Sequence, residues 1–176
     1  VPTARLGSGT ASSSTVLYGD QTYKAEPGGG KILQMVQGTH STATITTSTS
    51  LVDTGLTVDI TPQTDSDVLI SAFLSGCRKG VAATPYGQAV LYRGASAIWY
   101  MANGYAFDNN TNSSDQTIDI GTVGGAFLDT SPGGDGSTVI TYKVMFKTYD
   151  NSNSGNVQIC ANNSTSTITC IEYDTS

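Results

Sequence analysis

The feature that most limits the fold of this chain is an alternation of apolar and polar residues with a period of two. Residues 56–61 read Leu-Thr-Val-Asp-Ile-Thr, and residues 138–148 repeat such a pattern over a longer run. The residues expected to face a core in this second run are Ile140, Tyr142, Val144 and Phe146. A strand turns successive side chains to opposite faces, so the alternation places one face against a core and the other toward solvent. Apolar residues nowhere keep a helical period, and we therefore expect an all-β protein.

The composition agrees with short strands joined by many turns. Serine and threonine make up about a quarter of the 176 residues, and 20 residues are glycine. The net charge of -6 argues against a nucleic-acid partner, because binding to phosphates needs a surplus of Lys and Arg. No run of 18 apolar residues is present, so we expect no insertion into a membrane.

The chain divides into two parts at the glycines 28–30. Residues 1–30 hold too few large apolar side chains to offset an ordering cost of about 1–2 kcal/mol per residue. We expect them to be an extended arm that is ordered against other chains. Residues 31–176 should form an antiparallel β-sandwich or jelly-roll-like head. Because the chain begins with Val1 rather than Met, we also expect it to be a processed product or part of a longer protein.

Local patterns predict the strands of the head. The Ser- and Thr-rich stretch 31–62 is interpreted as nearly continuous β structure where the two parts join. Beyond it, the expected strands are a central buried one at 68–74, a hairpin of 89–93 with 97–101, and a final hairpin of 157–161 with 167–173. Arg78-Lys79-Gly80 is interpreted as a polar connection between strands.

The three cysteines, Cys77, Cys160 and Cys170, favour free thiols over a structural disulfide or zinc site. A disulfide framework has an even number of cysteines, and a zinc site usually has paired Cys-x-x-Cys units. Cys160 and Cys170 flank the expected last hairpin, so a disulfide between them is the alternative. Free thiols indicate assembly in a reducing cytoplasm.

No residue pattern predicts catalysis, a metal or a cofactor. His40 is the only histidine, which excludes a catalytic triad and a multi-histidine metal site within one chain. We interpret it as a loop residue, the alternative being a metal held by three copies of the chain. Neither glycine cluster, 7–9 or 28–30, matches a nucleotide-binding motif. Turn-like segments hold Asp108, Asp115, Asp129, Asp135 and Asp150. Asp commonly bonds its own backbone in turns, so the carboxylate pair of a glycoside hydrolase is not indicated.

Two polar loops are the candidate binding site. Sugars bind through an apolar ring face against an aromatic side chain and through amide or carboxylate groups that bond hydroxyls. The first loop and its flank offer Trp99, Tyr100, Asn103, Tyr105, Phe107, Asp108, Asn109 and Asn110. The second loop offers Tyr149, Asp150 and Asn151. The alternative is that Trp99 and Tyr100 are strand residues, one facing the core, and that the Asn-rich loop is a long turn.

The N-terminal part resembles a short element that closes the shaft of many bacteriophage tail fibres. The residues that carry the resemblance are Leu6, Gly7, Gly9, Thr10, Ala11, Thr15, Leu17, Gly19, Asp20 and Tyr23. The stretch 32–62 then resembles the opening of a β-rich distal domain found behind that element, although Leu51 stands where typical members carry an aromatic. Weaker similarity continues through 90–94, 141–144 and 164–169.

This resemblance implies a homotrimeric tail fibre, with residues 1–30 as the end of the shaft and 31–176 as a receptor-binding head. The fibre would be joined to the rest of the phage tail through its shaft, and would be a virion protein assembled in the host cytoplasm. It would mediate adhesion to the bacterial surface, through a polysaccharide or another receptor, without catalysis. Two alternatives stay open. One is a structural virion protein that binds no receptor, such as a head fibre, a decoration protein or a baseplate component. The other is a polysaccharide depolymerase.

Overall fold

The computed structural model describes residues 8–12, 15–25, 30–80, 87–103, 118–149 and 155–175. Two short strands belong to the N-terminal part, β1 (Thr15–Leu17) and β2 (Tyr23–Ala25). The strands of the head are β3 (Ile32–His40), β4 (Thr44–Thr46), β5 (Val52–Ile60), β6 (Ser66–Gly80), β7 (Gly87–Arg93), β8 (Ser96–Ala102), β9 (Ile118–Asp129), β10 (Ile140–Thr148), β11 (Asn156–Ile159) and β12 (Ser166–Asp174). One 3-10 turn, η4 (Ala161–Asn163), lies between the last two.

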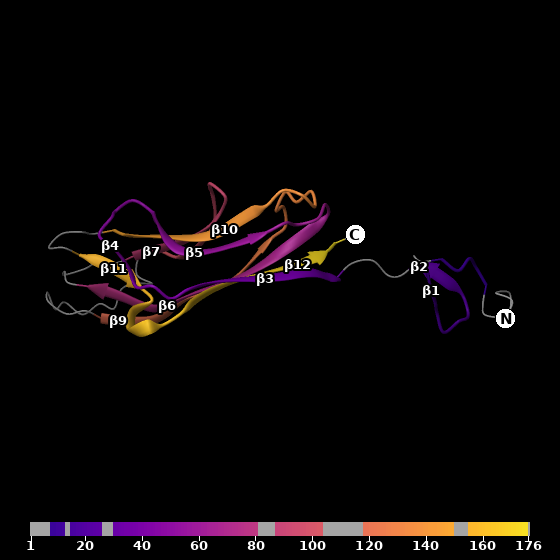
Figure 1. Ribbon diagram of the computed structural model, residues 1–176, viewed down its shortest axis with the longest axis horizontal. Helices are drawn as coiled ribbons and strands as arrows, with labels where there is room; N and C mark the ends of the chain where they lie inside the picture. The colour runs from indigo at the N-terminus through magenta and orange to yellow at the C-terminus, as the bar shows by residue number, and fades with distance from the viewer. Residues whose placement is uncertain are drawn as a thin grey trace.

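Two sheets stack face to face in the head (Figure 1). The four-stranded sheet has the order β5-β10-β7-β8. The six-stranded sheet has the order β3-β12-β6-β11-β4. In it, β12 and β11 pair with successive parts of one edge of β6, and β9 pairs with the opposite edge. Every pair of named strands in the head is antiparallel. The prediction of an all-β antiparallel sandwich is therefore confirmed.

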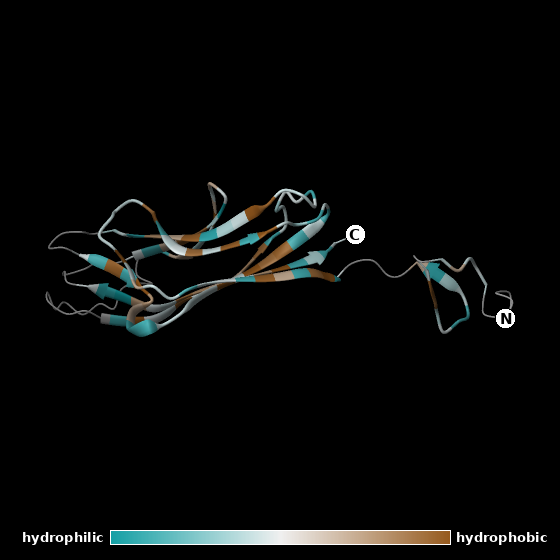
Figure 2. Ribbon diagram, viewed as in Figure 1, coloured by the Kyte–Doolittle hydropathy of each residue, from teal (hydrophilic) through white to brown (hydrophobic). Residues whose placement is uncertain are grey.

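The period-two stretches become strands with one buried face, as predicted. In β5, Leu56, Val58 and Ile60 are almost fully buried. In β10, Tyr142, Val144 and Phe146 are completely buried, although Ile140 at the start of the strand is only partly buried. Figure 2 shows hydrophobic and hydrophilic residues alternating along the strands. Burying each such side chain contributes about 1.5–3 kcal/mol before entropy is counted.

The prediction that Arg78-Lys79-Gly80 is a connection is wrong, because these residues are the last three of β6. A bulge at Gly76, whose φ is +59°, shifts the register against β9 between Leu74 and Cys77. A bulge inserts a residue into a strand without ending it. Beyond the bulge Cys77 and Lys79 are buried, so a lysine occupies a position that the sequence pattern assigned to solvent.

The predicted final hairpin is also wrong. β11 and β12 do not pair with each other; both pair with β6, β12 along Ser66–Phe73 and β11 along Arg78–Gly80. Cys160, just before the 3-10 turn, and Asn162 and Asn163 within it are in the left-handed region, with φ between 55° and 58°. Left-handed residues redirect the chain, so β12 pairs with the first half of β6, whereas β11 pairs with its last residues.

The stretch 31–62 forms β3, β4 and β5, so it is mostly β structure, with breaks at 41–43 and 47–51. β3 and β5 belong to different sheets and approach each other closely at Gly38. A Cβ added to Gly38 would lie 1.9 Å from the carbonyl oxygen of Thr57. Glycine is thus required where the edges of the two sheets meet.

The strand directions define two ends of the head. β3 begins and β12 ends at what we call the proximal end, where the Gly30 amide donates to the Asp174 carbonyl at 2.8 Å. β6 begins beside the end of β12 and runs to Gly80 at the opposite end, which we call the distal end. The chain therefore enters and leaves the described head at the same end.

The N-terminal part forms a two-stranded hairpin of β1 and β2. At its turn, the Asp20 carboxylate forms an ion pair with the ammonium group of Lys24 at 2.5 Å and accepts hydrogen bonds from Thr22. These bonds hold the pKa of the exposed Asp20 carboxyl at about 2. An isolated two-stranded hairpin is at best marginally stable in water. That residues 1–30 are a separate shaft segment stays a prediction.

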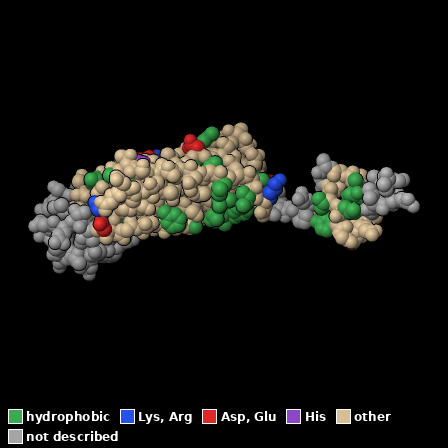
Figure 3. All heavy atoms as spheres, turned by 60° about the horizontal axis from the view of Figure 1, so that its bottom comes forward, with side chains coloured by type: hydrophobic (Ala, Val, Ile, Leu, Met, Phe, Trp, Pro, Cys, Tyr) green, Lys and Arg blue, Asp and Glu red, His purple; other side chains and the backbone are tan. Residues whose placement is uncertain are grey.

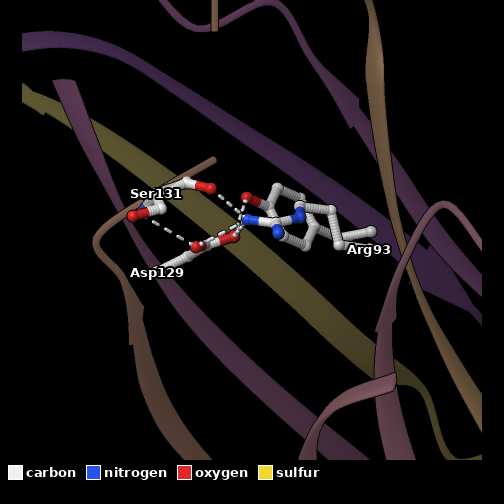
Figure 4. A network of polar contacts seen from close by, with 4 residues as sticks. Arg93, Asp129 and Ser131 are labelled. Atoms are coloured by element: carbon white, nitrogen blue, oxygen red, sulfur yellow. Dashed lines mark hydrogen bonds and ion pairs between the residues drawn. The ribbon is translucent and has the colours of Figure 1, made fainter. Parts of the chain in front are cut away.

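A buried polar cluster links the two sheets at Asp129, the last residue of β9 (Figure 4). Arg93 of β7 donates from Nη1 to both Asp129 carboxylate oxygens, at 2.9 and 2.8 Å, and to the carbonyl of Ser131. The Tyr142 hydroxyl donates to the same carboxylate at 2.8 Å. Asp129 is only 6% exposed, so its charge is balanced by one guanidinium and bonded by neighbouring groups, as a buried carboxylate requires.

All three cysteines are free and buried, as the free-thiol interpretation predicted. Burial raises the pKa of Cys77 to about 12 and, together with the charge of Asp129, that of Cys170 to about 12, from an ordinary value of 9.0. The thiolate is the reactive form of cysteine. Cys77 and Cys170 are thus held as the less reactive, protonated thiols in the folded chain.

Iodoacetamide at about pH 8 is therefore expected to leave the thiols of the folded chain unlabelled and to label all three in urea. The raised pKa values also fix the sign of the pH dependence. The folded state favours the protonated thiols, so this contribution to stability is complete below about pH 9 and is lost as the pH rises toward 12. Mass spectrometry after a timed pulse of reagent measures the labelling. Rapid labelling of Cys77 or Cys170 in the native protein would contradict the burial.

Candidate functional site

Six described strand ends gather at the distal end of the head. There β10 ends beside the start of β7, where Thr148 pairs with Gly87, and β8 ends where Ala102 pairs with Ala89. In the other sheet, the last residues of β6 pair with the first residues of β9 and β11. Both predicted binding loops therefore start from this end. Loops that connect rigid strands commonly carry binding functions.

Trp99 is a strand residue whose ring faces the neighbouring sheet. It lies in β8 and stacks on Phe127 of β9, with ring centroids 6.0 Å apart and an interplanar angle of 17°. A Cβ on Gly125 would lie 3.0 Å from the Trp99 ring, so β9 passes directly under the indole. The indole fills the gap between the edge strands β8 and β9, in agreement with the alternative of a core-facing strand residue.

Asn103 and Tyr149, which lie 46 positions apart, meet at the distal end. The Tyr149 hydroxyl donates to Oδ1 of Asn103 at 2.6 Å. The buried Gln88 donates from Nε2 to the same oxygen at 2.9 Å. Two donors fix the orientation of the Asn103 amide, and its NH₂ group is on the side of the amide away from them. The two candidate loops are thus joined at their bases by a direct contact.

The aromatic surface at this place carries a positive charge. The ammonium group of Lys147 lies over the Tyr149 ring, 4.4 Å from its centroid, and the Tyr149 side chain is 37% exposed. Tyr100, on the outward face of β8, is 59% exposed. A tyrosine ring presents an apolar body with a polar tip, so this end offers two rings, a fixed amide and a cation.

Gln88 and Lys147 were missed by the sequence-based reasoning. The signal for Lys147 was present, since period two in β10 turns it outward one step before the loop. Nothing in the sequence pairs Gln88 with Asn103, because that contact depends on the order of strands. The remaining candidate residues lie outside the described part of the chain: Tyr105, Phe107, Asp108, Asn109, Asn110, Asp150 and Asn151.

His40 is the last residue of β3, so the prediction of a loop histidine is wrong. Its Nε2 lies 3.0 Å from Oγ1 of Thr44, and its ring covers Gly55, where an added Cβ would lie 2.6 Å from the ring. Within the described ranges no group of three His, Cys, Asp or Glu side chains could hold a metal ion. The ring fills space between β3 and β5.

The described aspartates of the turn cluster have structural partners. The Asp135 carboxylate accepts bonds from the backbone and hydroxyl of Thr138, at 2.6 and 2.8 Å, and from those of Ser137. These bonds hold the pKa of Asp135 well below its usual range. A carboxylate held ionised in this way stabilises a turn, but it carries no proton to donate as a general acid. Asp129 is bound in the buried cluster.

A pocket of about 400 Å³ opens at the proximal end, away from both candidate loops. It is lined by backbone and small polar side chains of the β5–β6 and β9–β10 connections, with the carboxylates of Asp65 and Asp67. The Tyr173 hydroxyl donates to Asp67 at 3.2 Å. The pocket offers hydroxyls and carboxylates but no aromatic ring among its lining residues, so it lacks the platform on which a sugar ring stacks.

Comparisons with known proteins assign no family. No family model and no curated protein matches the chain. It is similar to a chain in the structure of infectious bursal disease virus, Gt strain, with a TM-score of 0.30, 10% identity, and coverage of 87% of this chain and 42% of that one. For the Gx strain the values are 0.27, 10%, 90% and 44%. The chain spans less than half the length of these two chains, and TM-scores this low support no conclusion. Within the described residues no helix is long and apolar enough to cross a membrane.

Proposed function

We propose that this chain is a virion protein of a bacteriophage, the end of a tail fibre whose distal end adheres to a glycan on the bacterial surface. The assignment to a tail fibre rests on the resemblance of the sequence, and one structural observation carries the proposed binding site. The two loops singled out by their composition start from the same end of the head, and their bases are joined by the Tyr149–Asn103 hydrogen bond. That end lies opposite the one at which the chain enters the head.

The chemistry of the distal end fits an uncharged or acidic sugar. The exposed rings of Tyr100 and Tyr149 offer apolar faces, and the Asn103 amide can bond hydroxyl groups. Lys147 adds a positive charge beside one ring, which would attract a uronic or sialic carboxylate. Such a site binds weakly alone. Several heads on one virion would convert weak binding into strong avidity.

Replacing Tyr149 with alanine is expected to weaken binding to the target polysaccharide about tenfold or more, as is typical of a central aromatic contact. Binding of the purified chain to immobilised bacterial surface polysaccharides measures the effect. Tyr149→Phe separates the ring from its hydroxyl, since it keeps the ring and removes the bond to Asn103. Val139→Ala is the control, because Val139 is also an exposed apolar residue, at 59%, but precedes the first residue of β10 at the proximal end. Equal binding by all variants would contradict the proposed site.

The same incubation separates the two rival functions. Saturable binding to polysaccharide that stays intact supports adhesion. Shortened polysaccharide chains would instead identify a depolymerase, and the complete absence of binding would favour a structural virion protein. Gel filtration of the polysaccharide before and after incubation distinguishes these outcomes.

A further inference from the structure

The outward face of the six-stranded sheet carries a row of apolar side chains in register. Met35 of β3 pairs with Ile171 of β12, which pairs with Leu69 of β6, which pairs with Leu128 of β9. Residues opposite each other on neighbouring strands lie on the same face of a sheet. Met35 is 68% exposed and Leu128 is 42% exposed. A continuous apolar row on the solvent side departs from the usual pattern of one buried and one polar face.

Toward the distal end, the outward positions that border this row carry no charge. The next two outward rows toward the distal end are Gln37, Thr169, Ser71 and Ala126, and then Thr39, Thr167, Phe73 and Gly124. Figure 3 shows the hydrophobic side chains gathered on this face, with no charged side chain among them. We call these twelve positions the neutral face. Charges lie at its margins, with Asp67 on the proximal side and the Arg78–Asp119 ion pair on the distal side.

The charge distribution favours a second copy of this chain as the occupant. Each chain has a net charge of -6, so two copies repel each other wherever their charged surfaces meet. On the neutral face they meet without that cost. Charges confined to the margins of the face also agree with the polar rim that is usual in a protein interface.

The area of the neutral face, compared with the area that a stable interface buries, favours copies that run in parallel. Four strands about 4.8 Å apart, with three outward positions about 6.8 Å apart, give a face of roughly 400 Å² in projection. A stable interface buries about 800 Å² per partner. Further exposed apolar area is present at Ile32 at the start of β3, which is 64% exposed, and at Val16 and Leu17 of the N-terminal hairpin, which are 41% and 46% exposed. Two chains running in the same direction would cover both surfaces together.

We propose that the neutral face and the N-terminal hairpin together form the surface on which further copies of this chain pack in parallel. The inference does not depend on what the distal end binds, and its test measures mass rather than binding. It assigns the outward face of the six-stranded sheet to the interior of the assembly. The outward face of the four-stranded sheet, with Tyr100, is then left to solvent.

The test compares two substitutions on the same face of the same sheet. Met35→Glu places a charge in the apolar row. Ile45→Glu is the matched control, because Ile45 is 58% exposed and lies outside the neutral face, in the distal row with Gln158, Arg78 and Asp119. In sedimentation equilibrium of the full chain, Met35→Glu is expected to raise the dissociation constant of the oligomer about 100-fold or more, since an unpaired charge in an interface is strongly disfavoured. Ile45→Glu should leave it unchanged.

A second measurement does not depend on the stability of the Met35 variant. A cysteine at Ile171, in the second of the four strands, is expected to cross-link copies through a short bis-maleimide, whereas a cysteine at Ile45 is not. The three native cysteines are buried and do not compete. A wild-type chain that is monomeric at every concentration would overturn the proposal. So would an oligomer insensitive to Met35→Glu, or cross-linking at Ile45 equal to that at Ile171.

Discussion

Replacing Asp129 with alanine is expected to lower the free energy of unfolding by about 3–5 kcal/mol, the usual cost of breaking a buried ion pair by removing one partner. The carboxylate accepts two bonds from Arg93 and one from the Tyr142 hydroxyl. Without it, the guanidinium, whose side chain is 30% exposed, loses its counter-ion. The phenol of Tyr142, which is completely buried, loses its acceptor. Urea unfolding followed by circular dichroism measures the change.

Two further variants divide the effect between the partners. Tyr142→Phe removes one bond and leaves the ion pair, so it should cost only about 1–2 kcal/mol. The double variant should then cost less than the sum of the two single variants, because both remove the same contact. Burial and the bond to Asp129 raise the pKa of Tyr142 above its ordinary value, so stability should fall at strongly alkaline pH as the phenol ionises. A loss below about 1 kcal/mol for Asp129→Ala would contradict the buried cluster.

Replacing Gly38 with alanine is expected to cost about 3 kcal/mol or more, at the upper end for an overpacked site. The new Cβ would lie 1.9 Å from the Thr57 oxygen and 2.9 Å from its carbonyl carbon. Because both atoms belong to backbone, relief requires β3 to move away from β5, and both strands also pair with other strands. Thermal unfolding of the two chains measures the loss.

The control for this substitution is Gly19→Ala. Nothing lies within 4 Å of a Cβ added at Gly19, so that variant should be as stable as the wild type. If Gly38→Ala unfolded at the same temperature as Gly19→Ala, β3 and β5 would not approach each other as described, and the closure of the sandwich on this side would be wrong.

Sequence periodicity predicted the strands that have a simple environment. Residues 56–60 and 140–148 each have one face toward the core and one toward solvent. The alternation of apolar and polar side chains in the sequence therefore identifies these strands directly. β6 was only partly predicted, because its bulge at Gly76 interrupts the alternation and Lys79 is buried beyond it. A local pattern cannot distinguish a bulged strand from a strand that ends.

The partners of each strand were less predictable than the strands themselves. The chain after Cys160 resembles a hairpin in composition, yet three left-handed residues direct β12 onto a different part of β6. The same holds for the candidate site. Composition identified the loops after Ala102 and Thr148, but the contact of Tyr149 with Asn103 depends on β7 lying between β8 and β10. Asp129 was interpreted as a turn residue, since its partner Arg93 is 36 positions away.

The central claim is that the distal end of this head binds a bacterial surface glycan, and a glycan array tests it most directly. The wild-type chain is applied to an array of bacterial surface polysaccharides beside Tyr149→Ala and Val139→Ala. We expect saturable binding to a small set of related glycans, retained by Val139→Ala and lost by Tyr149→Ala. No bound glycan, or equal binding by the wild type and Tyr149→Ala, would contradict the claim.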